Sequence, residues 1–249
     1  MYDREETAYI TKKFFTQMRG RIMKEYKILL LDADGTLFDF DACEKEALKL
    51  TFERYGYPLN DEIIQLYTEI NIALWKQYER GEIDRNTVIY TRFGALFEKL
   101  GIQDDGIAFE DTYQELLGRQ HFMIENVIEV LEYLYQKYDL YIVTNGVTVT
   151  QYSRLKGSGV DRYMKKIFVS EETGYQKPRK EFFDYCFQRI EKLELSKTLI
   201  IGDSLSSDIL GGNNAGIDTC WYNPASLMNN TDARVDYEIR SLKELLELL

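Results

Sequence analysis

The most constraining feature of this sequence is an apolar run of four residues, 28–31, which leads directly into two aspartates and a glycine (KILLLDADGT, residues 27–36). A run this short, followed at once by polar residues, is typical of a strand buried on both faces. Ligands bind at the carboxyl ends of strands in open parallel sheets, which is where Asp32 and Asp34 lie. Because Asp-Gly is also a common turn pair, this stretch alone leaves a plain turn and a functional site open.

The second half of the chain alternates strands and helices. Further strands are predicted at residues 139–144, 166–170, 198–202, 219–222 and 237–239. Helices are predicted at about 127–134, 151–156, 181–193, 208–215 and 242–249. This alternation predicts an α/β fold, in which helices cover both faces of a parallel sheet.

A block of helices separates the first strand from the second. Apolar residues recur at helical spacing in segments near residues 41–55, 63–74, 89–100 and 109–117. Strand-like alternation does not return until Leu140. We therefore expect an N-terminal extension at residues 1–22, an α/β core domain at 23–40 and 123–249, and an inserted helical domain at 41–122. Most aromatic side chains of the insert are expected in its own core. Four could instead face a substrate: Tyr67, Trp75, Tyr78 and Tyr90.

Composition narrows the classes of function. The chain has 249 residues, enough for one large domain or one domain with an insertion. Its net charge of −11 disfavours a nucleic acid polymer as partner, but a metal ion could still bring in a small phosphorylated substrate. Cys43, Cys186 and Cys220 are far apart, which predicts buried thiols in a reducing compartment. No membrane span or signal peptide is visible, so a cytoplasmic protein is expected, of open oligomeric state.

Further polar residues follow the ends of the later predicted strands. Thr144 and Asn145 end the second strand, and Lys177 lies in the loop after the third. Asp203 ends the fourth strand, with Asp208 about one helical turn onward. Each of these residues has an ordinary explanation as a helix cap or a surface residue. Together they would meet at one edge of the sheet, and their types suit the nucleophile, acid, metal ligand, cation and phosphate donor of one reaction.

These motifs resemble those of the haloacid dehalogenase (HAD) superfamily, and within it the phosphatases. The resemblance runs from about residue 23 to the end, with four motifs in order: DxDGT at 32–36, Thr144, Lys177 and GDxxxxD at 202–208. It implies a HAD-like three-layer sandwich with a Rossmann-like parallel sheet and a helical type-one cap, here the insert between the first two motifs. The stretches LLDADGTLFDFD, IVTNG, GYQKP and GDSLSSDI further resemble the YjjG-type pyrimidine 5'-nucleotidases.

The resemblance also implies how a phosphate monoester would be hydrolysed. Mg²⁺ would be held by Asp32, the backbone carbonyl of Asp34 and Asp203, since this ion prefers oxygen ligands. Asp32 would attack phosphorus and form an aspartyl-phosphate. Asp34 would protonate the leaving alcohol, and would then take a proton from the water that hydrolyses the intermediate.

The remaining motif residues would bind and neutralise the phosphoryl group. Thr144 would donate a hydrogen bond to a phosphoryl oxygen, and Asn145 would contribute to the same substrate site. Lys177 would offset negative charge on the nucleophile and on the phosphoryl group. Asp208 would orient Lys177, or would act through a metal-bound water.

Other functions of the same fold stay open at this point. A haloacid dehalogenase uses the same nucleophile but needs no acid two residues later, so Asp34 favours phosphoryl transfer. A phosphomutase, or a phosphatase for sugar phosphates or phosphoglycolate, would share Asp34. A non-catalytic binding module would be expected to lack one of these groups, and none is missing. The expected partner is a small phosphorylated substrate, with a pyrimidine nucleoside 5'-monophosphate as the more specific hypothesis.

Overall fold

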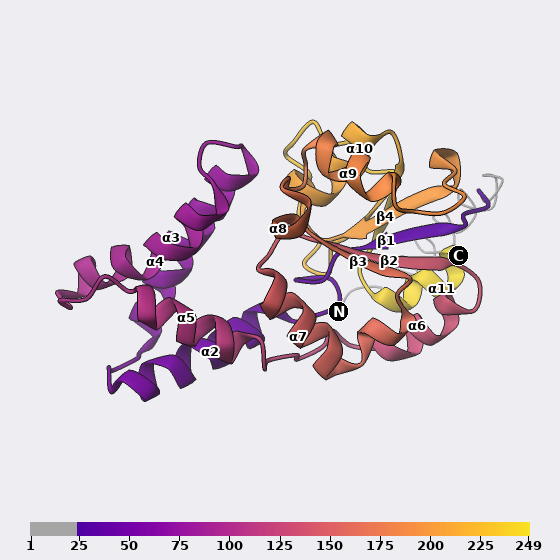
Figure 1. The fold of residues 1–249 in the computed structure, drawn as a ribbon. Coiled ribbons are helices and arrows are strands. Elements are labelled where there is room, and N and C mark those ends of the chain that lie inside the picture. Colours follow the sequence, from indigo (N-terminus) through magenta and orange to yellow (C-terminus); the bar gives the residue numbers. More distant parts are fainter. Residues whose placement is uncertain (1–23) are drawn as a thin grey trace, which may run out of the picture.

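The computed structural model describes residues 24–249, so the predicted extension at 1–22 lies outside the described residues. Six parallel strands form one sheet in the order β3-β2-β1-β4-β5-β6 (Figure 1). The strands are β1 (Ile28–Leu31), β2 (Asp139–Thr144), β3 (Lys166–Val169), β4 (Thr198–Gly202), β5 (Asp218–Tyr222) and β6 (Tyr237–Ile239). The chain runs outward from β1 on one side and then returns to β4. The carboxyl ends of β1 and β4 therefore form the switch point at which such sheets bind ligands.

The sheet is buried on both faces because the apolar side chains of β1 alternate between two cores. Leu29 and Leu31 pack on one face, and Ile28 and Leu30 pack on the other. The first face is covered by α6 (Val127–Tyr135), α7 (Thr148–Ser158) and α11 (Leu245–Leu248). The second is covered by α9 (Lys180–Phe187) and α10 (Leu210–Ala215). Figure 1 shows these helices on opposite sides of the sheet, which confirms the predicted three-layer α/β fold.

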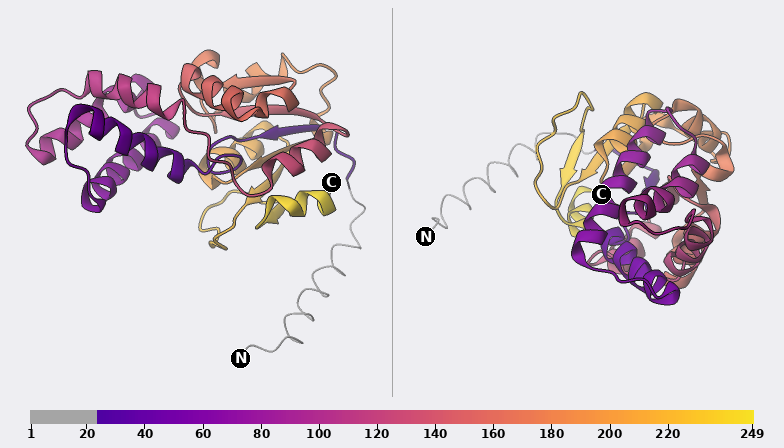
Figure 2. Two further views of the ribbon diagram at one scale, coloured as in Figure 1. Left: turned by 90° about the horizontal axis from the view of Figure 1, so that it is seen from below. Right: turned by 90° about the vertical axis from the view of Figure 1, so that its left-hand side faces the viewer.

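Four helices inserted between β1 and β2 form a second body. They are α2 (Phe40–Tyr55), α3 (Asp61–Glu79), α4 (Arg85–Leu100) and α5 (Ile107–Leu117). Figure 1 and the left view of Figure 2 place them at one end of the molecule, beyond the sheet. Their apolar stripes face one another and form a hydrophobic core. Phe93 and Phe109 lie in this core, with ring centroids 4.7 Å apart. We refer to this helical block as the cap, and its division from the core domain at residues 41 and 122 stays our proposal.

The ends of the cap helices follow from local sequence. The side chains of Asp39, Asn60 and Asp84 accept hydrogen bonds from backbone N–H groups in the first turns of α2, α3 and α4. Gly56 and Gly101 end α2 and α4 in the left-handed conformation, which glycine adopts without a steric penalty.

One strand and one helix of the core end earlier than the sequence predicts. The strand expected to reach residue 170 ends at Val169, where a short helix begins, α8 (Ser170–Thr173). The helix expected to reach residue 193 ends at Phe187. The amides of Arg189 and Ile190 then bond to carbonyls three residues back, which tightens the turn, and Lys192 has a φ of 52°. This turn keeps Ile190 in the core on the same face of the sheet as α9, although its apolar spacing continues the helical pattern.

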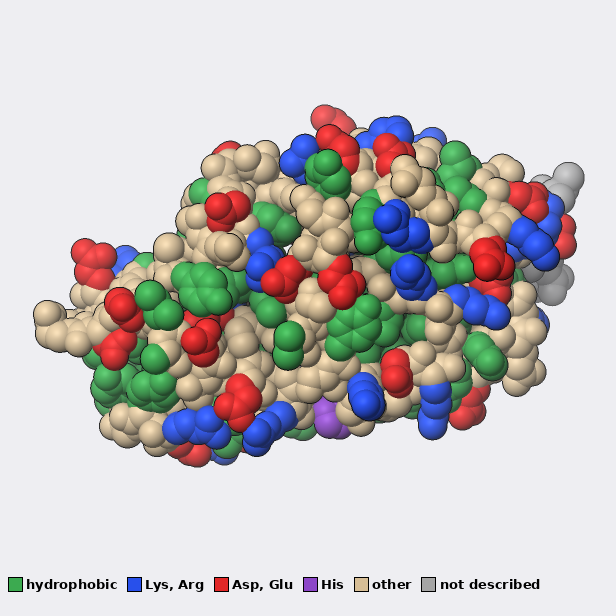
Figure 3. Space-filling model, in the orientation of Figure 1, with side chains coloured by type: hydrophobic (Ala, Val, Ile, Leu, Met, Phe, Trp, Pro, Cys, Tyr) green, Lys and Arg blue, Asp and Glu red, His purple; other side chains and the backbone are tan. Residues whose placement is uncertain are grey.

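Shorter segments complete the core domain. Turns of 3₁₀ helix lie at Val160–Tyr163, Leu195–Lys197 and Leu242–Glu244, and a π-helical turn at Leu205–Ile209 precedes α10. All three cysteines are buried and unpaired, as predicted. Within residues 24–249, no helix has the length and apolar character needed to cross a membrane. Acidic and basic side chains are interspersed on the face shown in Figure 3.

Candidate active site

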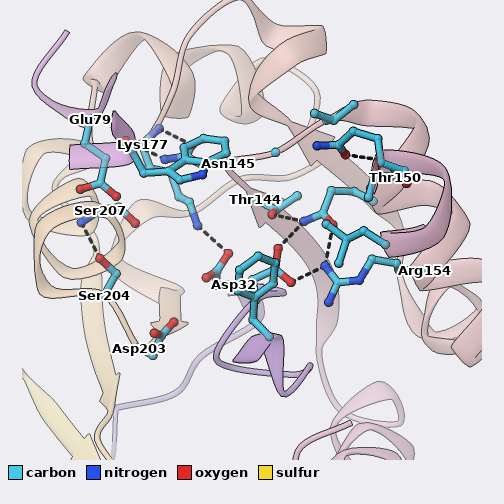
Figure 4. Close-up of a pocket in the computed structure, with 18 of the residues that line it drawn as sticks. Asp32, Glu79, Thr144, Asn145, Thr150, Arg154, Lys177, Asp203, Ser204 and Ser207 are labelled. Atoms are coloured by element: carbon cyan, nitrogen blue, oxygen red, sulfur yellow. Dashed lines mark hydrogen bonds and ion pairs between the residues drawn. The ribbon is translucent and has the colours of Figure 1, made fainter. Parts of the chain in front are cut away.

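The polar residues predicted at the strand ends meet in one pocket between the sheet and the cap (Figure 4). Asp32 directly follows β1, Thr144 is the last residue of β2, and Asp203 directly follows β4. The pocket is lined by six of the predicted residues: Asp32, Asp34, Thr144, Asn145, Lys177 and Asp203. The seventh, Asp208, is fully buried behind Lys177. The parallel sheet therefore brings together all seven predicted site residues, from four separate parts of the chain.

Lys177 lies at the centre of this group and is almost fully buried. Its Nζ donates to Asp32 Oδ1 at 2.7 Å, to Asp208 Oδ1 at 2.6 Å and to the Val143 carbonyl at 2.8 Å. Burial alone would lower the pKa of Lys177, but the carboxylates of Asp208 and Asp32 outweigh it and raise that pKa. Lys177 is therefore a cation held against Asp32, and the contact with Asp208 that the sequence predicted is present.

Asn145 fixes the backbone of the same lysine. Its Oδ1 accepts from the Lys177 N–H at 2.9 Å, and its Nδ2 donates to the Lys177 carbonyl at 3.0 Å. Asn145 thus ties the loop after β3 to the end of β2. The sequence predicts Asn145 as part of the substrate site. Asn145 lines the pocket, and its carboxamide is hydrogen-bonded to the backbone of Lys177.

Three carboxylates converge beside Lys177. Asp32, Asp203 and Asp208 each present an oxygen within 4.8 Å of the others. Burial and the neighbouring Asp208 raise the pKa of Asp203 to about 7, and the same two causes raise the pKa of Asp32. A divalent cation would offset this repulsion, and an all-oxygen donor set suits Mg²⁺. The side chains therefore fit the metal that the sequence predicted.

A glycine permits the close approach of this carboxylate cluster to the β1 turn. Gly35 has a φ of 80°, and a Cβ built on it would lie 2.5 Å from Asp203 Oδ2. Thr36 Oγ1 donates to Asp203 Oδ1 at 3.2 Å. The Gly-Thr pair after the two aspartates therefore joins the β1 turn to the end of β4.

Asp34 has different surroundings from Asp32. Its Oδ1 is paired with Nη1 of Arg154, and its Oδ2 accepts from Gln151 Nε2 at 2.8 Å. Its side chain is not part of the carboxylate cluster, and the use of its backbone carbonyl as a metal ligand stays a prediction. Sequence reasoning missed Gln151 and Arg154. The available signal was their i, i+3 spacing on the helix that follows Thr144, which puts both on one face.

The cap closes the other side of the pocket. Trp75 and Glu79 of α3 line it, so Trp75 is the one of the four aromatic candidates that does so. Tyr67 is buried in the cap core, and Tyr90 is on the surface. Tyr78 is buried beside a contact between the cap and the core domain.

Three polar contacts join the far end of the cap to the core domain. Gln176 Nε2 donates to the Tyr78 carbonyl at 2.6 Å, and Ser206 Oγ donates to Glu79 Oε2 at 2.8 Å. Arg85 and Glu171 form an ion pair at 2.8 Å. These contacts lie away from the two chain connections between cap and core, so the cap is held on both sides of the pocket.

Comparison with known proteins identifies the family. Residues 29–222 match the family described as haloacid dehalogenase-like hydrolase. The HAD-hydrolase YfnB of Bacillus subtilis is 47% identical over 227 residues, which cover 91% of this chain and 97% of that protein. A crystal structure of YfnB bound to magnesium, described as revealing interdomain movement, superposes with a TM-score of 0.87 at 46% identity and covers 91% of this chain and 99% of that one.

Two nucleotidases are also related along nearly their whole length. The pyrimidine 5'-nucleotidase PynA of Streptococcus pneumoniae is 42% identical, covering 90% of this chain and 95% of that protein. The pyrimidine 5'-nucleotidase YjjG of Escherichia coli is 31% identical, covering 89% of this chain and 96% of that protein. With the strand order and the four motifs in place, this chain belongs to the haloacid dehalogenase-like hydrolases.

Proposed function

We propose that this hydrolase is a magnesium-dependent phosphatase that acts on pyrimidine nucleoside 5'-monophosphates through an aspartyl-phosphate. The observation that carries the proposal is the buried Lys177, which contacts Asp32 and Asp208 beside a carboxylate cluster at the switch point of the sheet. Such a site combines a carboxylate nucleophile with the positive charge that a dianionic phosphate ester requires. The two nucleotidase relatives support the substrate class.

The first half of the reaction transfers the phosphoryl group to Asp32. A carboxylate oxygen of Asp32 attacks phosphorus, and the bond between phosphorus and the leaving oxygen breaks. Asp34, in its protonated form, gives its proton to that oxygen, so the nucleoside leaves as an alcohol. Lys177 offsets the negative charge that gathers on Asp32 and the phosphoryl oxygens, and the Thr144 hydroxyl donates to one of those oxygens.

The second half restores Asp32. Water attacks the phosphorus of the aspartyl-phosphate, and Asp34 takes the proton that the water loses. Orthophosphate leaves, and Asp32 again pairs with Lys177, which Asp208 and Asn145 keep in place. Bound Mg²⁺, held by Asp32, the Asp34 carbonyl and Asp203, would supply further positive charge to the phosphoryl group.

A substrate screen tests the proposal. Uridine and thymidine monophosphates, including deoxy forms, should give higher kcat/KM values than hexose phosphates or phosphoglycolate, and para-nitrophenyl phosphate should be hydrolysed only when magnesium is present. A markedly higher kcat/KM for a sugar phosphate would move the protein to the alternative phosphatases. Transfer of the phosphate to another position of the same molecule, without release of orthophosphate, would identify a phosphomutase, and release of chloride from a chloroacid would identify a dehalogenase.

The nucleophile is tested separately. Asp32→Asn keeps the shape of the side chain but replaces the carboxylate with a poor nucleophile, so turnover should fall below detection while the far-ultraviolet circular dichroism is unchanged. Asp232→Asn, on an exposed aspartate, is the matched control and should retain full activity. Wild-type turnover by a pure, folded Asp32→Asn sample would refute the assignment.

A further inference from the structure

We propose that Gln151 is a positioning residue that couples the phosphate-binding hydroxyl of Thr144 to the carboxylate of Asp34. The inference rests on the proposed phosphatase function and goes beyond it, since Gln151 belongs to none of the four sequence motifs. Its Nε2 donates to Thr144 Oγ1 at 2.7 Å and to Asp34 Oδ2 at 2.8 Å. Gln151 is almost fully buried and lines the pocket.

The orientation of the Gln151 carboxamide is set by its other contact. Nη1 of Arg154 donates to Gln151 Oε1 at 3.0 Å, and a guanidinium can only donate. The end of the carboxamide that faces Arg154 must therefore be the carbonyl oxygen. The NH₂ group is then directed at Thr144 and Asp34, and its two hydrogens match these two acceptors.

This arrangement determines what the Thr144 hydroxyl can do. A hydroxyl has one proton to donate, and the hydrogen bond from Gln151 uses only an acceptor position. Among residues 24–249, Gln151 is the only hydrogen-bond partner of Thr144 Oγ1, and Thr144 lines the pocket (Figure 4). The proton of Thr144 is therefore left for a phosphoryl oxygen. Gln151 thus makes Thr144 a donor toward the substrate.

The same carboxamide restrains the side chain of Asp34. Gln151 binds one carboxylate oxygen, and Arg154 binds the other. Arg154 is itself held, because its Nε donates to the Gln120 carbonyl at 3.0 Å and its guanidinium lies over the ring of Phe38, 4.6 Å from the centroid. Asp34 is therefore held at a fixed distance from Thr144 by a short, rigid link through Gln151.

A glycine beside the pocket leaves the space that Gln151 occupies. A Cβ added to Gly146 would lie 2.9 Å from Gln151 Cγ and 3.2 Å from its Nε2. Any larger residue at position 146 would displace the carboxamide. The loop after β2 is therefore shaped around Gln151 as well as around Asn145.

The test replaces Gln151 with residues of similar shape and measures single-turnover phosphorylation of the full-length protein with magnesium. Gln151→Met keeps the length and volume but removes both donors. Phosphorylation by para-nitrophenyl phosphate should slow about 10-fold, as expected when one hydrogen bond to a charged group is lost. Phosphorylation by uridine 5'-monophosphate should slow further, since its leaving group also needs the proton of Asp34. Gln188→Met makes the same change on an exposed residue after α9 and should match the wild type.

A second variant separates positioning from space filling. Gln151→Glu is nearly isosteric, but its carboxylate has no hydrogen to donate to Asp34 and would accept the Thr144 proton. It should lose at least as much activity as Gln151→Met. A residue that merely fills space would leave both variants near the wild-type rate, and that result would overturn the proposal. Failure of both variants to fold would make Gln151 a structural residue and would overturn it too.

The route of the effect is tested by a mutant cycle. In a Thr144→Val, Asp34→Ala background, Gln151→Met should cause no further loss of phosphorylation rate, because both of its side-chain acceptors are gone. An undiminished loss in that background would refute the coupling. Binding of inorganic phosphate, followed by calorimetry, should weaken in Gln151→Met as in Thr144→Val. Absence of any phosphohydrolase activity in the wild type would instead refute the proposed function. The two failures can be told apart, because the comparison of phosphate binding between variants needs no turnover.

Discussion

Asp34 differs from Asp32 in its partners, and this difference predicts a distinct kinetic signature. A general acid matters most when the leaving group is a strong base, such as a nucleoside 5'-alkoxide, and typically contributes about 10²–10⁴-fold. Para-nitrophenolate is a weak base and leaves without a proton. Asp34→Asn should therefore slow single-turnover phosphorylation by a nucleotide far more than by para-nitrophenyl phosphate. An equal loss on both substrates would assign Asp34 to the metal or to the fold.

Asp203 predicts how the protein responds to magnesium. An ion that binds only the native state raises the free energy of unfolding. At about 100 times its Kd it should raise the melting temperature by roughly 5 °C or more. Asp203→Ala removes one of the three converging carboxylates and should weaken this shift and the activity together. Asp232→Ala, at an exposed position, is the control. An unchanged magnesium shift in Asp203→Ala would place the ion elsewhere.

The helices of the cap enclose a polar network within their apolar core. Asn71 of α3 donates to Glu44 Oε1 at 2.9 Å and accepts from Arg92 at 2.9 Å. Arg92 of α4 makes a two-pronged ion pair with Glu110 of α5, at 2.6 and 2.7 Å. All four side chains are buried. The network joins the four cap helices. It also makes the free energy of unfolding depend on pH.

Burial raises the pKa of Glu44 from 4.5 to about 7, against the opposing pull of Arg92. The folded state thus holds this proton to higher pH than the unfolded chain does, so the free energy of unfolding falls as the pH rises from about 4.5 to about 7. Glu44→Gln keeps the acceptor for Asn71 and removes the titration. Relative to the wild type, the variant should gain up to about 3 kcal/mol over that interval in urea unfolding.

The matched control for this pH effect is Glu53→Gln, on the exposed face of the same helix. Its difference in unfolding free energy from the wild type, measured over the same pH interval, is the reference for Glu44→Gln. A Glu44→Gln difference that does not change between pH 4.5 and 7.5 would contradict the raised pKa of Glu44. In that case, the neighbours of Glu44 in the folded cap would stabilise its carboxylate as strongly as water does in the unfolded chain.

For the molecule as a whole, the contacts between cap and core domain predict an effect on substrate affinity. Arg85→Glu would place like charges together at Glu171 and so disfavour the arrangement in which the cap covers the pocket. Apparent affinity falls with the fraction of binding-competent molecules. KM should rise about 3- to 10-fold while kcat stays within about twofold, as expected for one partly exposed ion pair.

The control for this experiment is Arg80→Glu, since Arg80 pairs with Glu82 within the cap and on its surface. It carries the same charge change without touching the core domain, and its KM should equal that of the wild type. Equal KM values for Arg85→Glu and the wild type would show that the ion pair does not influence closure of the cap.

Local sequence was enough to predict the strands and the polar residues that follow them. An apolar run has its own period, and the carboxyl ends of parallel strands meet at one edge in any sheet of this kind. Asp32, Thr144 and Asp203 could therefore be assigned to one site from their positions alone. The end of α9 could not, because Ile190 continues the apolar spacing of the helix after its backbone has turned.

Only the tertiary structure identified the partners of Asp34. Gln151 and Arg154 are 117 and 120 residues away from it along the chain, and both lie on a helix whose polar residues would ordinarily face water. Which face of α7 turns toward the pocket depends on how Leu155 packs beneath the sheet. The sequence therefore determined which residues could carry the chemistry at the strand ends. Packing between distant segments decided which side chains hold these residues in place. Such contacts leave no periodic pattern in the local sequence, so they could not be predicted from it.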